Sequence, residues 1–148
     1  MKLKVIKFDN YKCPRREHHN DSGADCFSAV KMTIPPHEVR AVPTGVGVYL
    51  PDGYDLVVHC KSGLSKKGIW AANAPIDAGY RGQIHAILYN TTDAPFIIEE
   101  GQKIGQFVMR PVIYPDFVDS FGKERESGAF GSTGDKWFCY IFEVLYLF

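Results

Sequence analysis

The chain has no excess of charge of either sign, no closely spaced cysteine pair and no long apolar run near its start. Its 148 residues include 17 lysines and arginines and 17 aspartates and glutamates, whereas a protein that binds nucleic acid without sequence preference needs a basic surplus. The N-terminal apolar residues are interrupted by Lys2, Lys4 and Lys7, which argues against a signal peptide. We therefore expect a cytoplasmic protein that binds neither nucleic acid nor membranes.

The cysteines form no recognisable framework. Four are scattered without CxxC spacing: Cys13, Cys26, Cys60 and Cys139. Such spacing favours reduced thiols over disulfide bonds. A zinc site built from the first two cysteines with His18 and His19 is an alternative, although its spacing matches no common zinc pattern.

Long helical periodicity is absent as well. Proline and glycine recur about every eight to twelve residues and bound short runs rich in strand-forming residues at 46–50, 55–59 and 104–109. In a further run, Ile84, Ala86 and Leu88 alternate with His85, Ile87 and Tyr89. This pattern predicts an all-β fold, a jelly-roll-like distorted barrel with at most one short helix.

Local signals predict a turn and that helix. Pro51-Asp52-Gly53 lies between two predicted strands and is typical of a hairpin turn. Ser62 can act as the N-cap of a short helix over 63–67, with Gly68 at the C′ position. Because a helix N-terminus presents free N–H groups, this segment can bind phosphate; the alternative is a plain surface turn.

Residues 73–82 contain the clearest candidate for a catalytic carboxylate. Their proline and glycines predict a hairpin that places Asp77 beside Tyr80. An exposed aspartate is ionised at neutral pH and can accept a proton from water. The alternative is a turn aspartate whose side chain only bonds its own backbone.

Residues 125–134 combine glycines, hydroxyl groups and one aromatic ring. Arg125 can bind phosphate oxygens through two N–H groups, and Phe130 offers a face on which a base can stack. Ser132 and Thr133 can donate hydrogen bonds. We expect the segment to close only over a ligand, whereas the plain alternative is a glycine-rich linker.

With two further segments, these motifs resemble the trimeric dUTPase family, the deoxyuridine triphosphate nucleotidohydrolases. Five segments occur in family order, at 22–25, 61–65, 73–82, 101–106 and 125–134. Each motif alone is weak, but five in order are specific.

The resemblance implies an all-β homotrimer that uses Mg²⁺ to hydrolyse dUTP to dUMP and pyrophosphate. Asp77 matches the residue that activates the attacking water, and Asp25 matches the carboxylate that holds Mg²⁺ through water. The implied substrate-binding residues are Lys61, Ser62, Gly63, Asn73, Tyr80, Gln106, Arg125, Phe130, Gly131, Ser132 and Thr133. In the family these groups come from three subunits, so a single chain would hold no complete site.

The expected layout is one dUTPase-like domain over 1–134, with a flexible arm at about 122–134, and an extension at 135–148. From residue 137 onward the extension is almost wholly apolar and is too short to span a bilayer. It is therefore a candidate for a subunit contact or for docking a protein partner.

Several positions depart from the family pattern. Two residues that the family usually has between Pro75 and Ile76 are absent, Lys61 replaces an arginine, and Cys60 stands where proline is common. Glu126 and Ala129 replace glycines of the last motif.

These departures leave two alternative functions. One is a catalytically weakened regulatory or binding protein with the dUTPase fold. The other is an enzyme similar to the related dCTP deaminases, which is disfavoured because residues 73–82 contain no glutamate.

Overall fold

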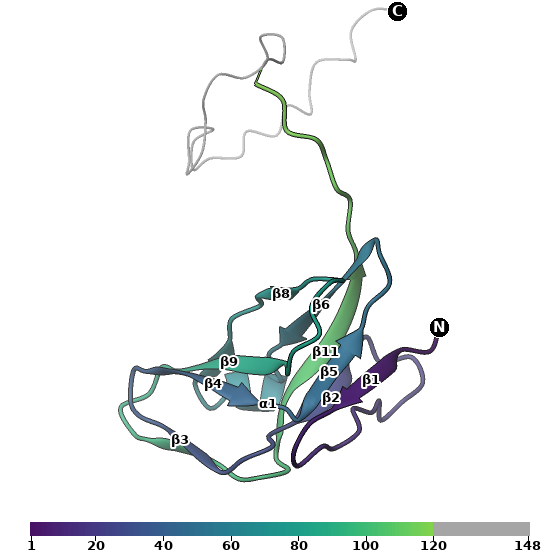
Figure 1. Ribbon diagram of the computed structural model, residues 1–148. Coiled ribbons are helices and arrows are strands. Elements are labelled where there is room, and N and C mark those ends of the chain that lie inside the picture. The colour runs from purple at the N-terminus through teal and green to yellow at the C-terminus, as the bar shows by residue number, and fades with distance from the viewer. Residues whose placement is uncertain (120–148) are drawn as a thin grey trace, which may run out of the picture. The chain divides into compact units, whose positions relative to one another are not determined.

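The structure is a computed structural model that describes residues 1–119. The expected arm and extension, at 122–148, lie outside the described residues. Met1–Tyr114 form one compact unit (Figure 1). Its elements are β1 (Lys4–Lys7), β2 (Ala24–Phe27), β3 (Met32–Ile34), β4 (Val39–Pro43), β5 (Val46–Tyr49), β6 (Tyr54–His59), α1 (Ser62–Ser65), β7 (Ile69–Ala71), β8 (Pro75–Ile76), β9 (His85–Asn90), β10 (Phe96–Ile98) and β11 (Lys103–Pro111).

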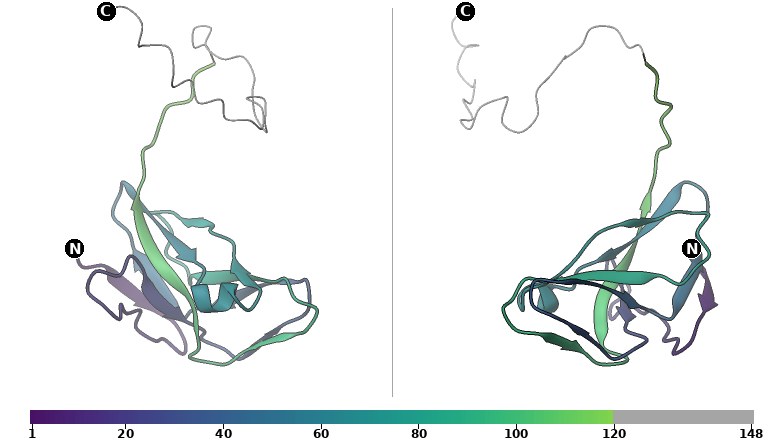
Figure 2. Two further views of the ribbon diagram at one scale, coloured as in Figure 1. Left: turned by 180° about the vertical axis from the view of Figure 1, so that it is seen from behind. Right: turned by 60° about the vertical axis from the view of Figure 1, so that its left-hand side comes forward.

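The strands of the described part form four small antiparallel sheets. Their strand orders are β2-β11-β6-β8, β4-β9-β7, β1-β5 and β3-β10. Figure 2 shows that β11 crosses much of the fold and that the β3–β10 pair lies at the end away from β1. The all-β prediction with one short helix is confirmed. That helix, α1, has four residues, far fewer than a membrane crossing requires.

The core lies between these sheets and is built from aliphatic side chains. The alternation predicted for β9 is confirmed, since Ile84, Ala86 and Leu88 are buried while His85 and Tyr89 are exposed. Other large side chains with almost no exposed surface are Ile34, Val42, Val46, Val57, Ile69, Ile98 and Ile104.

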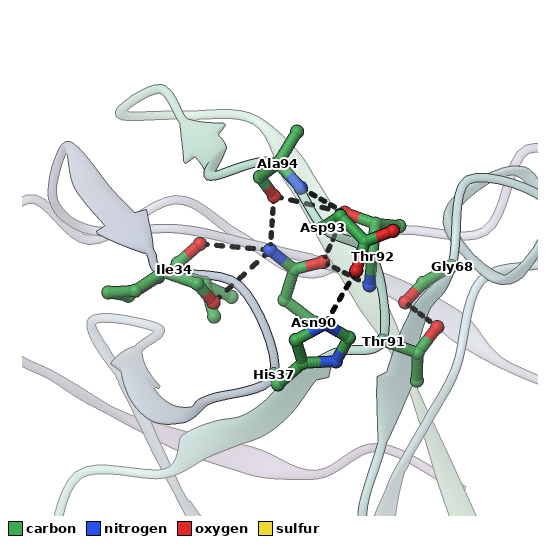
Figure 3. Close-up of polar contacts among 9 residues, drawn as sticks. Ile34, His37, Gly68, Asn90, Thr91, Thr92, Asp93 and Ala94 are labelled. Atoms are coloured by element: carbon green, nitrogen blue, oxygen red, sulfur yellow. Dashed lines mark hydrogen bonds and ion pairs between the residues drawn. The ribbon is translucent and has the colours of Figure 1, made fainter.

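One buried amide at the end of β9 joins the β3–β4 connection to the β9–β10 connection (Figure 3). The side-chain nitrogen of Asn90 donates to the carbonyl oxygens of Ile34, Pro35 and Ala94 at 3.1, 3.2 and 2.8 Å. Its oxygen accepts from the Thr92 hydroxyl at 2.8 Å. These bonds satisfy an amide that has no exposed surface, so the network offsets the cost of burying it.

Two hairpin predictions are wrong. The chain does turn at Gly53, whose φ is +80°, but β5 pairs with β1 whereas β6 pairs with β11 and β8. Residues 73–82 likewise include β8 and lead toward β9, and these two strands belong to different sheets. Turn residues indicate a reversal of direction, but they do not specify which strand pairs with which.

The predicted helix is present at the expected place, but the predicted N-cap residue is wrong. Lys61, not Ser62, is the N-cap residue of α1, and its side chain makes no capping hydrogen bond. Gly68 has the expected positive φ of +78° but lies two residues beyond the C-cap, Lys66. The helix is held instead by burial of Leu64 in the core.

Candidate active site

A nearly buried carboxylate, Asp25 on β2, is the centre of the candidate site. Its Oδ1 accepts hydrogen bonds from Nζ of Lys61 at 2.9 Å and from Nε2 of Gln106 at 3.3 Å. Its Oδ2 lies 2.7 Å from Nζ of Lys103. The first, second and fourth sequence motifs therefore meet at one side chain.

The pairing of β2 with β11 brings these motifs together. Gln106 faces Asp25 on one side and His59 of β6 on the other. A Cβ on Gly23 would lie 2.8 Å from Cβ of Gln106. Glycine is therefore required here for the first motif to approach β11 closely.

The neighbours of Asp25 keep its carboxylate ionised. Burial alone would raise its pKa, but the hydrogen bonds from Lys103, Lys61 and Gln106 outweigh burial and hold the pKa below its ordinary value. Asp25 therefore carries a full negative charge at neutral pH.

A cavity of about 400 Å³ opens beside this carboxylate, and we call it the Asp25 cavity. Its lining residues are Arg15, Glu17, Asp21, Ser22, Gly23, Asp25, Lys61, Lys103 and Gln106. The three cationic side chains in this lining suit a polyanion, and the carboxylates suit a hydrated cation that accompanies it.

Helix α1 borders this site through Lys61, its N-cap residue. Ser62 and Gly63 are exposed, and nothing lies within 4 Å of the position that a Cβ on Gly63 would take. The Ser65 hydroxyl donates to Sγ of Cys60 at 3.0 Å, which ties the last residue of the helix to the residue that follows β6. The start of α1 is thus open to a ligand, while its last residue, Ser65, is held by a hydrogen bond.

The acidic residues of residues 1–119 do not enclose a metal ion. No group of three or more His, Cys, Asp or Glu side chains in this part is arranged to hold one, which also contradicts the zinc alternative at Cys13. Asp25 is a single carboxylate, already bonded to two ammonium groups. It fits Mg²⁺ only where water and the phosphates of a ligand complete the coordination shell, an arrangement that Mg²⁺ favours.

The Asp77 loop, residues 73–82, forms a second cavity of about 250 Å³, the Asp77 cavity. Asp77 and Tyr80 close a turn in which the Tyr80 N–H donates to the Asp77 carbonyl at 3.0 Å. Both residues are exposed and line the cavity. Asn73 is exposed and is not among the residues that line it.

The shortened third motif still forms a strand. Pro75 and Ile76 pair with Val57 and Leu56 of β6. Because β8 is the last strand of its sheet, the missing N–H of Pro75 costs no ladder bond on the outer side. The loss of two residues therefore does not prevent Asp77 from following directly after a paired strand.

The two cavities share no lining residue. Asp25 and Asp77 belong to opposite edges of the β2-β11-β6-β8 sheet, three strand spacings apart. Asp25 pairs with Gln106, which pairs with His59 of β6. Asp77 follows Ile76, the partner of Leu56, and therefore lies near Asp55, four residues from His59 along β6. This register corresponds to about 19 Å between the Cα atoms of Asp25 and Asp77. A single phosphorus atom is therefore out of reach of both carboxylates of one chain.

Lys103 is a site residue that the sequence did not single out. In a regular strand, residues 103 and 106 would point to opposite faces. A register shift between Lys103 and Gly105 changes the phase, so both side chains reach Asp25. Among the residues predicted for the last motif, Arg125, Phe130, Gly131, Ser132 and Thr133 lie outside the described residues.

Comparisons with known proteins agree with this arrangement. The dUTPase family model matches residues 9–134. The deoxyuridine 5'-triphosphate nucleotidohydrolase of Clostridium tetani is 37% identical over 140 residues, 90% of this chain and 96% of that protein. The corresponding protein of Gloeothece citriformis is 40% identical over 141 residues, 90% of this chain and 97% of the relative.

Solved structures give the same result. A dUTPase of Staphylococcus bacteriophage 80alpha with dUpNHpp has a TM-score of 0.80 and 28% identity, covering 90% of this chain and 98% of the other. A dUTPase variant from phage phi11 of S. aureus, described for its structural Mg(II) ion, has a TM-score of 0.75 and 28% identity, covering 82% and 99%. The matched motifs, the fold and the site at Asp25 show that this chain belongs to the dUTPase family.

Proposed function

We propose that this protein hydrolyses dUTP to dUMP and pyrophosphate. The observation that carries the proposal is the convergence of three family motifs on Asp25, through Lys61 and Gln106. The curated relatives are named for this reaction, and neither regulatory binding nor deamination of dCTP is favoured by any of them.

We propose that three copies of the chain assemble and share their active sites. The separation of about 19 Å between Asp25 and Asp77 supports this, because a hydrogen bond spans about 3 Å and one bridging water only doubles that reach. A site in which Asp77 of one copy faces the Asp25 cavity of another removes the conflict, and a closed ring gives each copy one complete site.

The donor set at Asp25 fits a Mg²⁺ ion that arrives with the triphosphate. Asp25 would hold this ion through water, and Glu17 and Asp21 line the same cavity. Such an ion would neutralise charge on the leaving pyrophosphate. Lys61 and Lys103 add positive charge at the same place, so they favour the phosphates in both the ground state and the transition state.

The hydrolytic step itself rests on Asp77. Its exposed carboxylate accepts a proton from a water molecule that attacks the α-phosphorus in line with the departing pyrophosphate. Tyr80 lies against the deoxyribose, and its hydroxyl is fixed by a 2.8 Å bond to the Gln83 carbonyl.

The remaining substrate contacts complete the proposal. Ser62, Gly63 and Gln106 contact the α- and β-phosphates, and Asn73 with its neighbouring backbone reads the uracil edge. The last motif, outside the described residues, provides the γ-phosphate contacts and a stacking ring through Arg125, Phe130, Gly131, Ser132 and Thr133.

Pyrophosphate release from dUTP with Mg²⁺ tests this function. Asp77→Asn removes the proton acceptor and should lower turnover by about 10²–10⁴-fold with little change in dUTP binding. Asp52→Asn, at another exposed aspartate in a turn, is the matched control and should keep full turnover. A wild-type protein without turnover, or an Asp77→Asn protein with normal turnover, would refute the proposal.

We further propose that residues 1–134 are the catalytic domain and that 135–148 dock a protein partner. The apolar composition of residues 137–148 supports docking, and the scattered cysteines support a cytoplasmic location. Truncation after Gly134 should keep dUTP turnover and abolish partner binding; loss of turnover would contradict this division.

A further inference from the structure

A second basic cavity lies beside the Asp25 cavity and shares part of its wall. Its volume is about 430 Å³, and we call it the Lys12 cavity. Arg15 and Lys103 line both cavities. The other lining residues of the Lys12 cavity are Lys12, Cys13, Phe27 and Gly101. Because two cationic side chains belong to both walls, an anion can pass from one cavity to the other while it stays in a positive field.

The pairing of β2 with β11 positions the Lys12 ammonium group. Phe27, the last residue of β2, pairs with Lys103, the first residue of β11. Nζ of Lys12 lies 4.4 Å from the centroid of the Phe27 ring. The same Nζ donates to the Gly101 carbonyl oxygen at 3.4 Å. An ammonium group held by a ring and a carbonyl loses less freedom when a ligand binds, so Lys12 is positioned in advance.

The charge of the Lys12 cavity is unbalanced. No carboxylate lines it, and none of the ion pairs within residues 1–119 includes Lys12. Asp25 neutralises part of the charge of Lys103 from the other cavity. Glu17 lies 3.6 Å from Arg15 and 3.9 Å from Lys103, but its side chain is 60% exposed. Since ion pairs this exposed contribute little, an anion with several charges can replace Glu17.

We propose that the Lys12 cavity binds inorganic pyrophosphate after it leaves the Asp25 cavity. This inference rests on the proposed function, because hydrolysis of dUTP in the Asp25 cavity releases pyrophosphate beside the shared wall. Pyrophosphate carries negative charge on both phosphoryl groups, so one group can contact Lys12 while the other contacts Arg15 or Lys103. Excess pyrophosphate in this cavity then delays departure of the newly formed molecule and lowers kcat.

Isothermal titration calorimetry of the full chain with sodium pyrophosphate tests the site. The protein is first saturated with the dUTP analogue dUpNHpp, whose phosphates occupy the Asp25 cavity. The wild type should then still bind pyrophosphate. Lys12→Gln should raise the Kd of pyrophosphate about tenfold, which corresponds to the loss of one hydrogen bond to a charged group. Lys12→Arg keeps the charge and should bind pyrophosphate as tightly as the wild type.

Lys4→Gln is the matched control. Nζ of Lys4 also lies over an aromatic ring, 4.9 Å from the centroid of Tyr49, but Lys4 lines neither cavity. The control should bind pyrophosphate as the wild type does. A tenfold loss in the control as well would show that the effect comes from overall charge, and it would overturn the inference.

Product inhibition gives a second readout. Formation of dUMP is followed by chromatography at increasing concentrations of dUTP and pyrophosphate. Pyrophosphate that binds beside bound dUTP lowers kcat, whereas pyrophosphate that binds only in the Asp25 cavity raises KM alone. The wild type should show a lowered kcat, and Lys12→Gln should lose this effect. Without added pyrophosphate, Lys12→Gln should turn over dUTP as fast as the wild type, which also shows that the variant is folded.

The outcomes separate this inference from the proposed function. Exclusion of pyrophosphate by dUpNHpp, or equal binding to the wild type and Lys12→Gln, would overturn the inference even if dUTP is hydrolysed. Inhibition that changes only KM would overturn it too. Pyrophosphate binding that depends on Lys12, in a protein that does not hydrolyse dUTP, would refute the proposed function and support the Lys12 cavity as a pyrophosphate site.

Discussion

Nζ of Lys103 lies 2.7 Å from Oδ2 of Asp25. This contact joins the fourth motif to the first and, with Lys61 on Oδ1, leaves Asp25 between two ammonium groups. The Asp25 cavity is thus organised by charge before any ligand is present.

Asp25 should make the free energy of unfolding depend on pH in the acidic range. Its pKa is below the ordinary value in the folded state, so its contribution to the free energy of unfolding is complete above the unfolded pKa of about 3.9. This contribution is lost as the pH falls through the lower, folded pKa. Urea unfolding between pH 6 and pH 2 should therefore show a shallower acid dependence for Asp25→Asn than for the wild type. An equal pH dependence in the two proteins would show that the ion pairs of Asp25 do not stabilise the fold.

A shared active site predicts complementation between two inactive proteins. Asp77→Asn lacks the proposed proton acceptor and Asp25→Asn lacks the proposed metal-binding carboxylate, so each alone should be inactive. When equal amounts are unfolded and refolded together, about one quarter of the interfaces pair an intact Asp77 with an intact Asp25, and turnover should recover to about a quarter of the wild-type value. The pyrophosphate assay measures this. A mixture as inactive as its components would show that both carboxylates act from one chain.

The buried amide of Asn90 should be one of the most sensitive positions of the fold (Figure 3). Asn90→Ala removes three donated hydrogen bonds, one of them to the buried carbonyl group of Ile34. We expect the free energy of unfolding to fall by about 2–4 kcal/mol. Thr91→Val is the control, because the Thr91 hydroxyl donates to Gly68 at the surface and should matter far less. Urea unfolding with similar losses in both variants would contradict this account.

Thiol reactivity should follow burial. Cys26 has no exposed surface, and burial raises its pKa to about 12, whereas Cys13 is exposed. Since the thiolate is the reactive form, iodoacetamide at pH 8 should alkylate Cys13 and spare Cys26. Peptide mass mapping before and after unfolding in urea gives the comparison. Rapid alkylation of Cys26 in the folded protein would show that β2 opens readily.

The sequence predicted strands better than it predicted their partners. The alternation around Leu88 identified the inward and outward faces of β9, because burial follows the two-residue period directly. The turn at Gly53 was also correct, but the strands on either side of it lie in different sheets. Pairing depends on contacts between distant segments, which local residue patterns do not contain.

The candidate site shows the same division. Asp25, Lys61 and Gln106 were identified by motif, and the structure brings them into contact. Lys103 was missed because its direction depends on a bulge in β11, and a bulge has no reliable signature in one sequence. The separation of Asp25 from Asp77 also required the register of four strands.

The pairing of β2 with β11 has a consequence for the order of folding. Asp25 and Gln106 are 81 residues apart in the chain, so closing this loop is entropically expensive. In the described part, β2 has no other strand partner than β11, the last strand. In a nascent chain, the edge of β2 that pairs with β11 therefore stays unpaired until nearly the whole domain has been synthesised. The Asp25 cavity should form last, and fragments that stop before residue 103 should be prone to aggregate through that edge.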